Sequence, residues 1–127
     1  MSESKHNRWA DIEPEQLNPL VTRQYVVGTN TMLARLVLKK GAVVPLHQHF
    51  HEQISHVIEG ALNFRIDGKD LVIRAGEVLC IPPHVPHEVT TLEDTLAFDV
   101  FNPPRQDWID GDDAYLRGGS SAAPKRS

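Results

Sequence analysis

The chain has 127 residues, 40% hydrophobic and 24% charged, which suits one soluble globular domain. Its net charge of −4 argues against nucleic acid or an anionic membrane as the main partner, because both need a basic surface. The sequence has no apolar run of membrane-spanning length and no apolar N-terminal stretch typical of a signal peptide. Its single cysteine, Cys80, cannot form an internal disulfide. We therefore expect a cytoplasmic protein.

The chain divides into a polar start, a strand-rich middle and a polar end. Residues 1–20 are predicted to form an N-terminal extension, in which residues 11–18 could make one helical turn, limited by Pro14 and Pro19. Residues 21–117 are predicted to form one β domain with its C-terminal segment, and residues 118–127 a flexible tail. The predicted strands are 22–27, 32–38, 43–49, 53–58, 61–66, 69–73, 78–81, 87–91 and 95–101.

Turn residues separate these strands. Asp67-Gly68 is the strongest signal, because a two-residue type I′ hairpin needs positive φ angles, which Asp and Gly adopt at low cost. Glu59-Gly60 and Ala75-Gly76 mark further breaks, and no helical period exceeds two turns. Many short strands at regular spacing indicate an all-β fold, either an antiparallel sandwich or a barrel.

Six of the seven histidines fall between positions 47 and 87. His47 and His49 are two residues apart, so on an extended strand they point to the same side and can reach one cation. Gln53 follows on the next predicted strand, and His87 comes from a separate hairpin. Three imidazole nitrogens and one amide oxygen suit divalent Zn, Ni, Fe or Mn. Because all four are neutral, they leave the charge of the ion uncompensated.

The fourth ligand has alternatives. Glu52 would bind if the register differed by one residue, but strand alternation turns Glu52 away from the cavity and favours Gln53. The Gln53 amide could instead only hydrogen-bond His49. His51 and His84 are expected at the rim of the site or just behind the ligands.

A second polar cluster lies on the apolar strand 95–101. Burying Asp99 there is costly unless the carboxylate is paired or hydrogen-bonded. Asp99 therefore either pairs with an arginine, such as Arg35 or Arg105, or faces the metal cavity as a general acid or base with a raised pKa. Arg105 either lies solvated at the surface or closes over the cavity to hold a substrate carboxylate with its fork of donors. Phe101 either fills the core or lies under a sugar ring.

The histidine pattern resembles the cupin family, whose first motif has Gly, His-x-His, Glu and Gly at fixed spacing. Its positions are matched here by Gly41, His47, His49, Gln53 and Gly60, with Gln in place of Glu. The second motif is matched by Gly76, Pro82 and His87, with His84 where a turn glycine usually stands. The resemblance implies a single-domain cupin, a double-stranded β-helix or jelly-roll barrel.

Within the cupins, the chain is similar to KdgF-type proteins of pectin and alginate breakdown. The similar positions are Asp99, Phe101, Pro103, Pro104, Arg105, Asp107, Trp108 and the acidic ending 110–117. The resemblance implies a divalent metal held by His47, His49, Gln53 and His87. It also implies Asp99 as the main catalytic group, with Phe101 and Arg105 binding substrate. The implied reaction opens and ketonises 4,5-unsaturated uronates and needs no organic cofactor.

Two other functions remain open at this point. One is a different small metal cupin, an iron dioxygenase or a manganese lyase. The other is a non-catalytic binder of an anionic sugar. A homodimer is expected in each case, with Ile54, His56 and Ile58 as candidate contacts on the face away from the metal.

Overall fold

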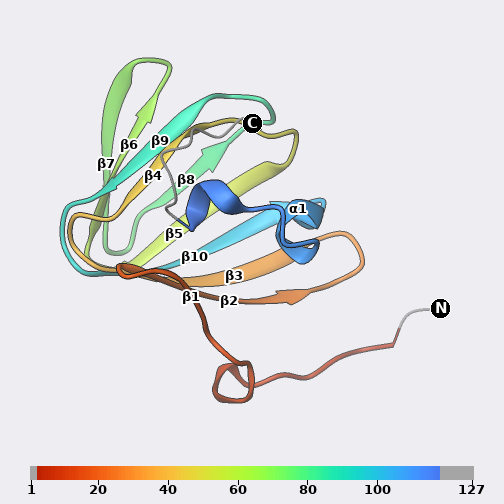
Figure 1. Cartoon of the computed structure of the whole chain (residues 1–127). Helices are drawn as coiled ribbons and strands as arrows, with labels where there is room; N and C mark the ends of the chain where they lie inside the picture. The colour runs from red at the N-terminus through yellow and green to blue at the C-terminus, as the bar shows by residue number, and fades with distance from the viewer. Residues whose placement is uncertain (1–2, 118–127) are drawn as a thin grey trace.

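The computed structural model describes residues 3–117, so the predicted tail, 118–127, lies outside the described residues. Residues 3–117 form ten strands in two antiparallel sheets (Figure 1). The strands are β1 (Glu15–Asn18), β2 (Val21–Val27), β3 (Met32–Leu38), β4 (Val43–His47), β5 (Glu52–Glu59), β6 (Ala61–Ile66), β7 (Lys69–Arg74), β8 (Val78–Ile81), β9 (His87–Thr91) and β10 (Thr95–Asn102). The short helical elements are η1 (Trp9–Asp11), α1 (Gln106–Ile109) and η2 (Ala114–Leu116).

The two sheets face each other and enclose the core. One sheet has the order β1-β2-β3-β10-β5-β8 and the other β4-β9-β6-β7. Buried apolar residues fill the space between them in two clusters, one around Met32 and Phe101, the other around Val57 and Phe64. The expected all-β jelly-roll barrel is confirmed.

Most strand predictions agree with the structure to within a residue or two, and 32–38, 61–66, 78–81 and 87–91 agree at both ends. The helical turn predicted within 11–18 is wrong. Only its first residue, Asp11, is helical, as the last residue of η1, and Glu15–Asn18 form β1, an edge strand paired with β2. The open edge of β2 supplies backbone partners, and Leu17 becomes buried in the core, which outweighs the weak strand propensity of this polar segment.

The hairpin between β6 and β7 has the turn that the sequence predicts. Asp67 and Gly68 both have positive φ, 52° and 77°, as a type I′ turn requires. Gly60 is required for a further reason. Its φ is 96°, and a Cβ atom there would collide with the backbone of Asp94 and Thr95. The β5–β6 corner therefore tolerates only glycine.

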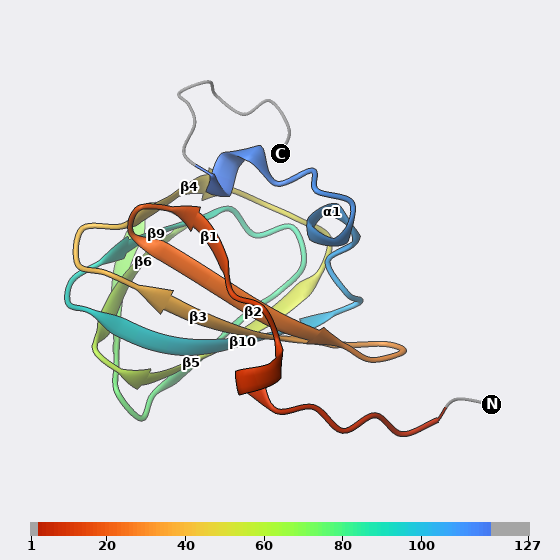
Figure 2. The ribbon, with the colours of Figure 1, turned by 60° about the horizontal axis from the view of Figure 1, so that its bottom comes forward.

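The C-terminal segment folds back across one end of the barrel. Figure 2 shows η2 beside the end of β4 and α1 beside the loop that follows β4, both above β1 and β2. Trp108 and Leu116 are buried in the core. Arg23 on β2, fully buried, donates to Asp113 at 2.8 Å and to Glu15 at 2.8 Å, which ties the segment before η2 to the barrel. Among the described residues, no helix is both long and apolar enough to cross a membrane.

Candidate metal and acid–base site

Three histidines converge at this end of the barrel. His47 is the last residue of β4 and lies opposite His87, the first residue of β9. His49 lies two residues beyond the end of β4, so the predicted strand through 49 is too long. The His49 carbonyl accepts a 2.7 Å hydrogen bond from the His84 N–H, which fixes the loop. One ring nitrogen from each of the three histidines lies within 4.8 Å of the others.

Backbone carbonyls orient all three rings in the same way. Each Nδ1 lies near a carbonyl oxygen two residues away in sequence: His47 with Pro45 at 2.8 Å, His87 with Val85 at 2.8 Å, and His49 with His51 at 3.1 Å. A proton on each Nδ1 can be donated to the nearby carbonyl oxygen. Each Nε2 then keeps a free electron pair, as in histidines that bind metals. The Nε2 of His87 is buried and has no hydrogen-bond partner among the described residues.

Gln53 completes the cluster from β5. Its Nε2 donates to the Ser55 hydroxyl at 2.9 Å and to Asp99 at 3.5 Å, so its Oε1 is turned toward His49 Nε2, 3.2 Å away. If Gln53 only hydrogen-bonded His49, the proton would sit on Nε2, and His49 Nδ1 would face the His51 carbonyl without one. Glu52 is exposed, as strand alternation predicts.

The electrostatics also suit a cation. Burial, followed by the charge of His87, lowers the pKa of His47 to about 3. Burial is the largest cause that lowers the pKa of His49 to about 3, and the positive charge of Arg105 is the second. Burial also lowers the pKa of His87. All three imidazoles are therefore neutral near pH 7 and need no proton release to bind metal. The buried unpartnered nitrogen and the neutral donors fit a divalent ion, and Zn, Ni, Fe and Mn all accept this set.

Asp99 faces the same cavity from β10, opposite Ser55. The alternative in which it pairs with an arginine is wrong. Within residues 3–117, Asp99 has no ion pair, Arg35 donates to Gln24, and Arg105 donates to Asp107. Burial raises the pKa of Asp99 to about 6, although a hydrogen bond from Ser55 and the charge of Arg105 oppose this shift. The carboxyl group can thus carry a proton close to neutral pH.

Arg105 is not a solvated surface residue, because only 2% of it is exposed. Its guanidinium lies over the rings of Phe101 (4.9 Å) and Trp108 (4.7 Å). Nε and Nη2 donate to the two oxygens of Asp107, and Nη2 also donates to the Tyr115 hydroxyl at 2.7 Å. The fork expected to be free for substrate is thus already held by Asp107.

Phe101 is 1% exposed, with Arg105 over its ring and His49 against its edge. This packing favours the core-filling role over a platform for a sugar. His51 is also buried, with its ring 5.3 Å from that of His49, and it lines the outer hollow beside the candidate ligands. His84 is exposed beside the outer hollow, and its φ of 68° is the left-handed conformation expected where a glycine usually stands.

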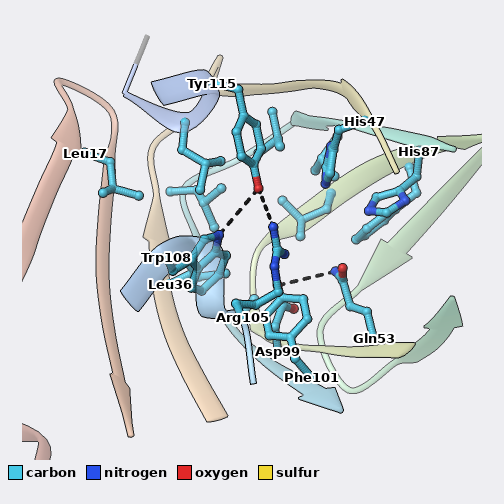
Figure 3. A pocket seen from close by; sticks show the side chains of 17 residues that line it. Leu17, Leu36, His47, Gln53, His87, Asp99, Phe101, Arg105, Trp108 and Tyr115 are labelled. Atoms are coloured by element: carbon cyan, nitrogen blue, oxygen red, sulfur yellow. Dashed lines mark hydrogen bonds between the residues drawn. The ribbon is translucent and has the colours of Figure 1, made fainter. Parts of the chain in front are cut away.

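Two spaces adjoin these residues. An inner cavity of about 60 Å³ is lined by Asp99, Gln53 and His87 and by apolar residues beneath them (Figure 3). An outer hollow of about 620 Å³ includes His49 and Asp107. His47, Arg105 and Tyr115 line both spaces. The inner cavity is too small for a sugar ring, so a ligand of that size would occupy the outer hollow, against these three residues.

Comparison with known proteins agrees with this geometry. The Cupin domain family matches residues 34–101, which hold all four candidate ligands and Asp99. The chain belongs to the cupin family. Its histidine cluster and Gln53 lie at the positions where the cupin motifs were matched in the sequence.

Several relatives of this cupin are similar along most of their length. A pectin degradation protein KdgF from Dickeya dadantii is 26% identical over 98 residues, which cover 75% of this chain and 89% of that protein. The structure of KdgF from Halomonas sp. has a TM-score of 0.78 at 27% identity and covers 84% of this chain and 99% of its own. The structure of an RmlC-like cupin from Shewanella frigidimarina has a TM-score of 0.77 at 31% identity. The match covers 85% of this chain and 99% of that chain.

The cupin motifs did not indicate two further residues of the site. Ser55 hydrogen-bonds Gln53 and Asp99, and its signal was its position two residues after Gln53, on the same face of β5. Tyr115 lies 68 residues after His47, yet their rings are 5.2 Å apart. Only the return of the C-terminal segment brings Tyr115 to the site.

Proposed function

We propose that this cupin is a metal-dependent enzyme that opens and ketonises 4,5-unsaturated uronates. The observation that carries the proposal is the position of Asp99, a buried carboxyl that can hold a proton and faces the cavity of the candidate metal ligands. The similarity to two KdgF proteins, one named for pectin degradation, supports the same reaction class.

The candidate metal ligands and Arg105 account for substrate binding. His47, His49, Gln53 and His87 would hold the divalent ion, which supplies Lewis acidity for the carboxylate and hydroxyl groups of a uronate. The positive charge of Arg105, held rigidly by Asp107, adds an attraction for the same anion. The substrate is thereby fixed relative to Asp99.

Asp99 supplies the proton transfer. In its protonated form it transfers a proton to C4 of the enol ether while water adds to C5. The water loses a proton to the carboxylate, which restores the acid. The C5 hemiketal then opens: the C5 hydroxyl gives up its proton, the bond between C5 and the ring oxygen breaks, the ring oxygen takes up a proton, and a keto group remains at C5. The pKa of about 6 lets Asp99 serve as acid and then base near neutral pH.

The test is loss of the ultraviolet absorbance of a 4,5-unsaturated galacturonate monomer above its spontaneous rate. Asp99→Asn should abolish the catalysed rate while metal content stays unchanged. Asp70→Asn is the matched control, because Asp70 is exposed on β7 and pairs only with surface groups. Full activity in Asp99→Asn would refute the role of Asp99.

Other outcomes would point to the alternatives. Oxygen uptake that depends on Fe(II), without uronate conversion, would indicate a dioxygenase. Calorimetric binding of a uronate without turnover would indicate an anionic-sugar binder.

We also propose a homodimer that forms through the outer face of β5. Ile54 and Ile58 are 36% and 37% exposed there, and Val78, opposite His56 on β8, is 54% exposed. Such apolar exposure on a sheet face is typical of contact surfaces. Light scattering should give twice the chain mass, and Ile54→Asp should yield monomers. A cytoplasmic location stays a prediction.

A further inference from the structure

The Tyr115 hydroxyl is the one polar group that lines both the inner cavity and the outer hollow without being a candidate metal ligand or a charged side chain. Its oxygen accepts hydrogen bonds from Arg105 Nη2 at 2.7 Å and from Trp108 Nε1 at 3.4 Å (Figure 3). Both neighbours are donors only. The hydroxyl proton therefore cannot point at either of them.

This proton has no acceptor among the described residues. A phenol that accepts a charge-assisted hydrogen bond becomes a stronger donor, because hydrogen bonds in a chain polarise one another. The structure thus presents a polarised O–H donor on a residue that lines both spaces. A ligand oxygen is the acceptor that would satisfy it.

The surroundings hold Tyr115 in this position. Its ring packs against His47, with centroids 5.2 Å apart. The residue at the start of η2, Asp113, is fully buried and accepts hydrogen bonds from Arg23 and Arg117. A fixed position allows the hydroxyl to act without a large loss of side-chain entropy on binding.

The hydrogen bonds of Arg105 explain why a substrate would need the Tyr115 hydroxyl as a donor. Nε and Nη2 of Arg105 are already engaged by Asp107, so its fork cannot hold a substrate carboxylate on that edge. The Tyr115 hydroxyl is a further donor beside Nη2, 2.7 Å away. We propose that Tyr115 is a substrate-binding residue that donates its hydroxyl proton to the carboxylate of the bound uronate. This inference rests on the proposed function.

The first experiment compares Tyr115→Phe with Tyr25→Phe. Tyr25 is the only other tyrosine, packs beside Trp108 and lines neither space, so it is a matched control. Loss of a hydrogen bond to a charged group should lower the affinity for D-galacturonate, measured by calorimetry, and the kcat/KM for the unsaturated monomer by about 10- to 100-fold. Metal content and Tm should not change.

A double-mutant cycle separates a direct contact from an effect through Arg105. In an Arg105→Gln background, a direct contact still gives a penalty for Tyr115→Phe, whereas a tyrosine that only positions Arg105 gives none. Absence of the penalty, or wild-type galacturonate binding by Tyr115→Phe, overturns the inference while leaving the reaction in place. A wild-type protein that neither binds nor converts uronates refutes the proposed function, and the inference with it.

A second measurement keeps the hydroxyl intact and so does not depend on the folding of a Tyr115 variant. In Tyr25→Phe protein labelled with ¹³C-tyrosine, Tyr115 gives the only tyrosine Cζ signal. Titration with D-galacturonate should shift this signal, and the same concentration of neutral D-galactose should shift it much less. Equal shifts with both sugars, or none with galacturonate, would contradict a carboxylate contact.

Discussion

Gln53 Oε1 lies 3.2 Å from His49 Nε2, and both atoms face each other as hydrogen-bond acceptors once His49 Nδ1 donates to the His51 carbonyl. Ser55 holds the amide in this orientation by accepting from Gln53 Nε2 at 2.9 Å. Two facing acceptors repel each other unless a cation lies between them. This pair is therefore the most specific sign of a metal site in the molecule.

Metal removal should lower stability. A ligand that binds only the folded state at 100 times its Kd raises the free energy of unfolding by about 2.7 kcal/mol, and a chelator should remove that increment. Thermal unfolding with chelator and then with added Zn, Ni, Mn or Fe(II) measures the change. His87→Ala should bind less metal and lose most of the response, whereas His56→Ala, on the outer face of β5, should retain it. An equal response in both variants would argue against the site.

Gln53→Glu should tighten metal binding and weaken activity. The new carboxylate neutralises part of the charge of the ion, which strengthens the bond but weakens its attraction for an anionic substrate. It also stands 3.5 Å from Asp99 in place of a donor amide nitrogen. Metal competition with a chromogenic chelator and uronate turnover measure the two effects. Glu52→Gln, the neighbouring exposed position, is the control.

The stability of the C-terminal segment should depend on pH through Asp113. Burial disfavours its charge, but hydrogen bonds from Arg117 and Arg23 outweigh burial and lower the pKa of Asp113 from its ordinary value of 3.8. The folded pKa lies below the unfolded one, so this stabilisation is present above the ordinary value and is lost as pH falls through the lowered folded value.

Asp113→Ala tests this dependence. Removing one partner of a buried ion pair should lower the free energy of unfolding by about 3–5 kcal/mol near neutral pH. Urea unfolding at several pH values should show a smaller acid-induced loss in Asp113→Ala than in the wild type. Glu93→Ala, at an exposed site, should follow the wild-type curve. Identical slopes for Asp113→Ala and the wild type would contradict the assignment.

Gly60→Ala should destabilise the fold more than Gly41→Ala. Both glycines have positive φ, 96° and 93°, so both substitutions strain the backbone by about 1 kcal/mol. A Cβ at 41 meets open space, whereas at 60 it collides with the backbone of Asp94 and Thr95, which adds about 1–3 kcal/mol. Chemical denaturation measures the difference, and equal losses would show that the β5–β6 corner can relax.

The residues of the metal cluster could be predicted from the motif spacing, although His49 lies beyond the end of β4, where strand alternation does not apply. Alternation along β5 places Gln53 inside and Glu52 outside whatever the rest of the chain does. The same alternation places Asp99 and Phe101 on one face of β10. The turn at Asp67-Gly68 follows from local backbone preference alone.

The tertiary structure decided what depends on distant segments. β1 forms because the open edge of β2 accepts it, and Gln53 lies 3.5 Å from Asp99 because β5 pairs with β10. Tyr115 reaches His47 only because the buried pair of Arg23 and Asp113 anchors the returning chain. No local sequence pattern predicts these contacts, because their energies come from burial and charge pairing between residues far apart in the sequence.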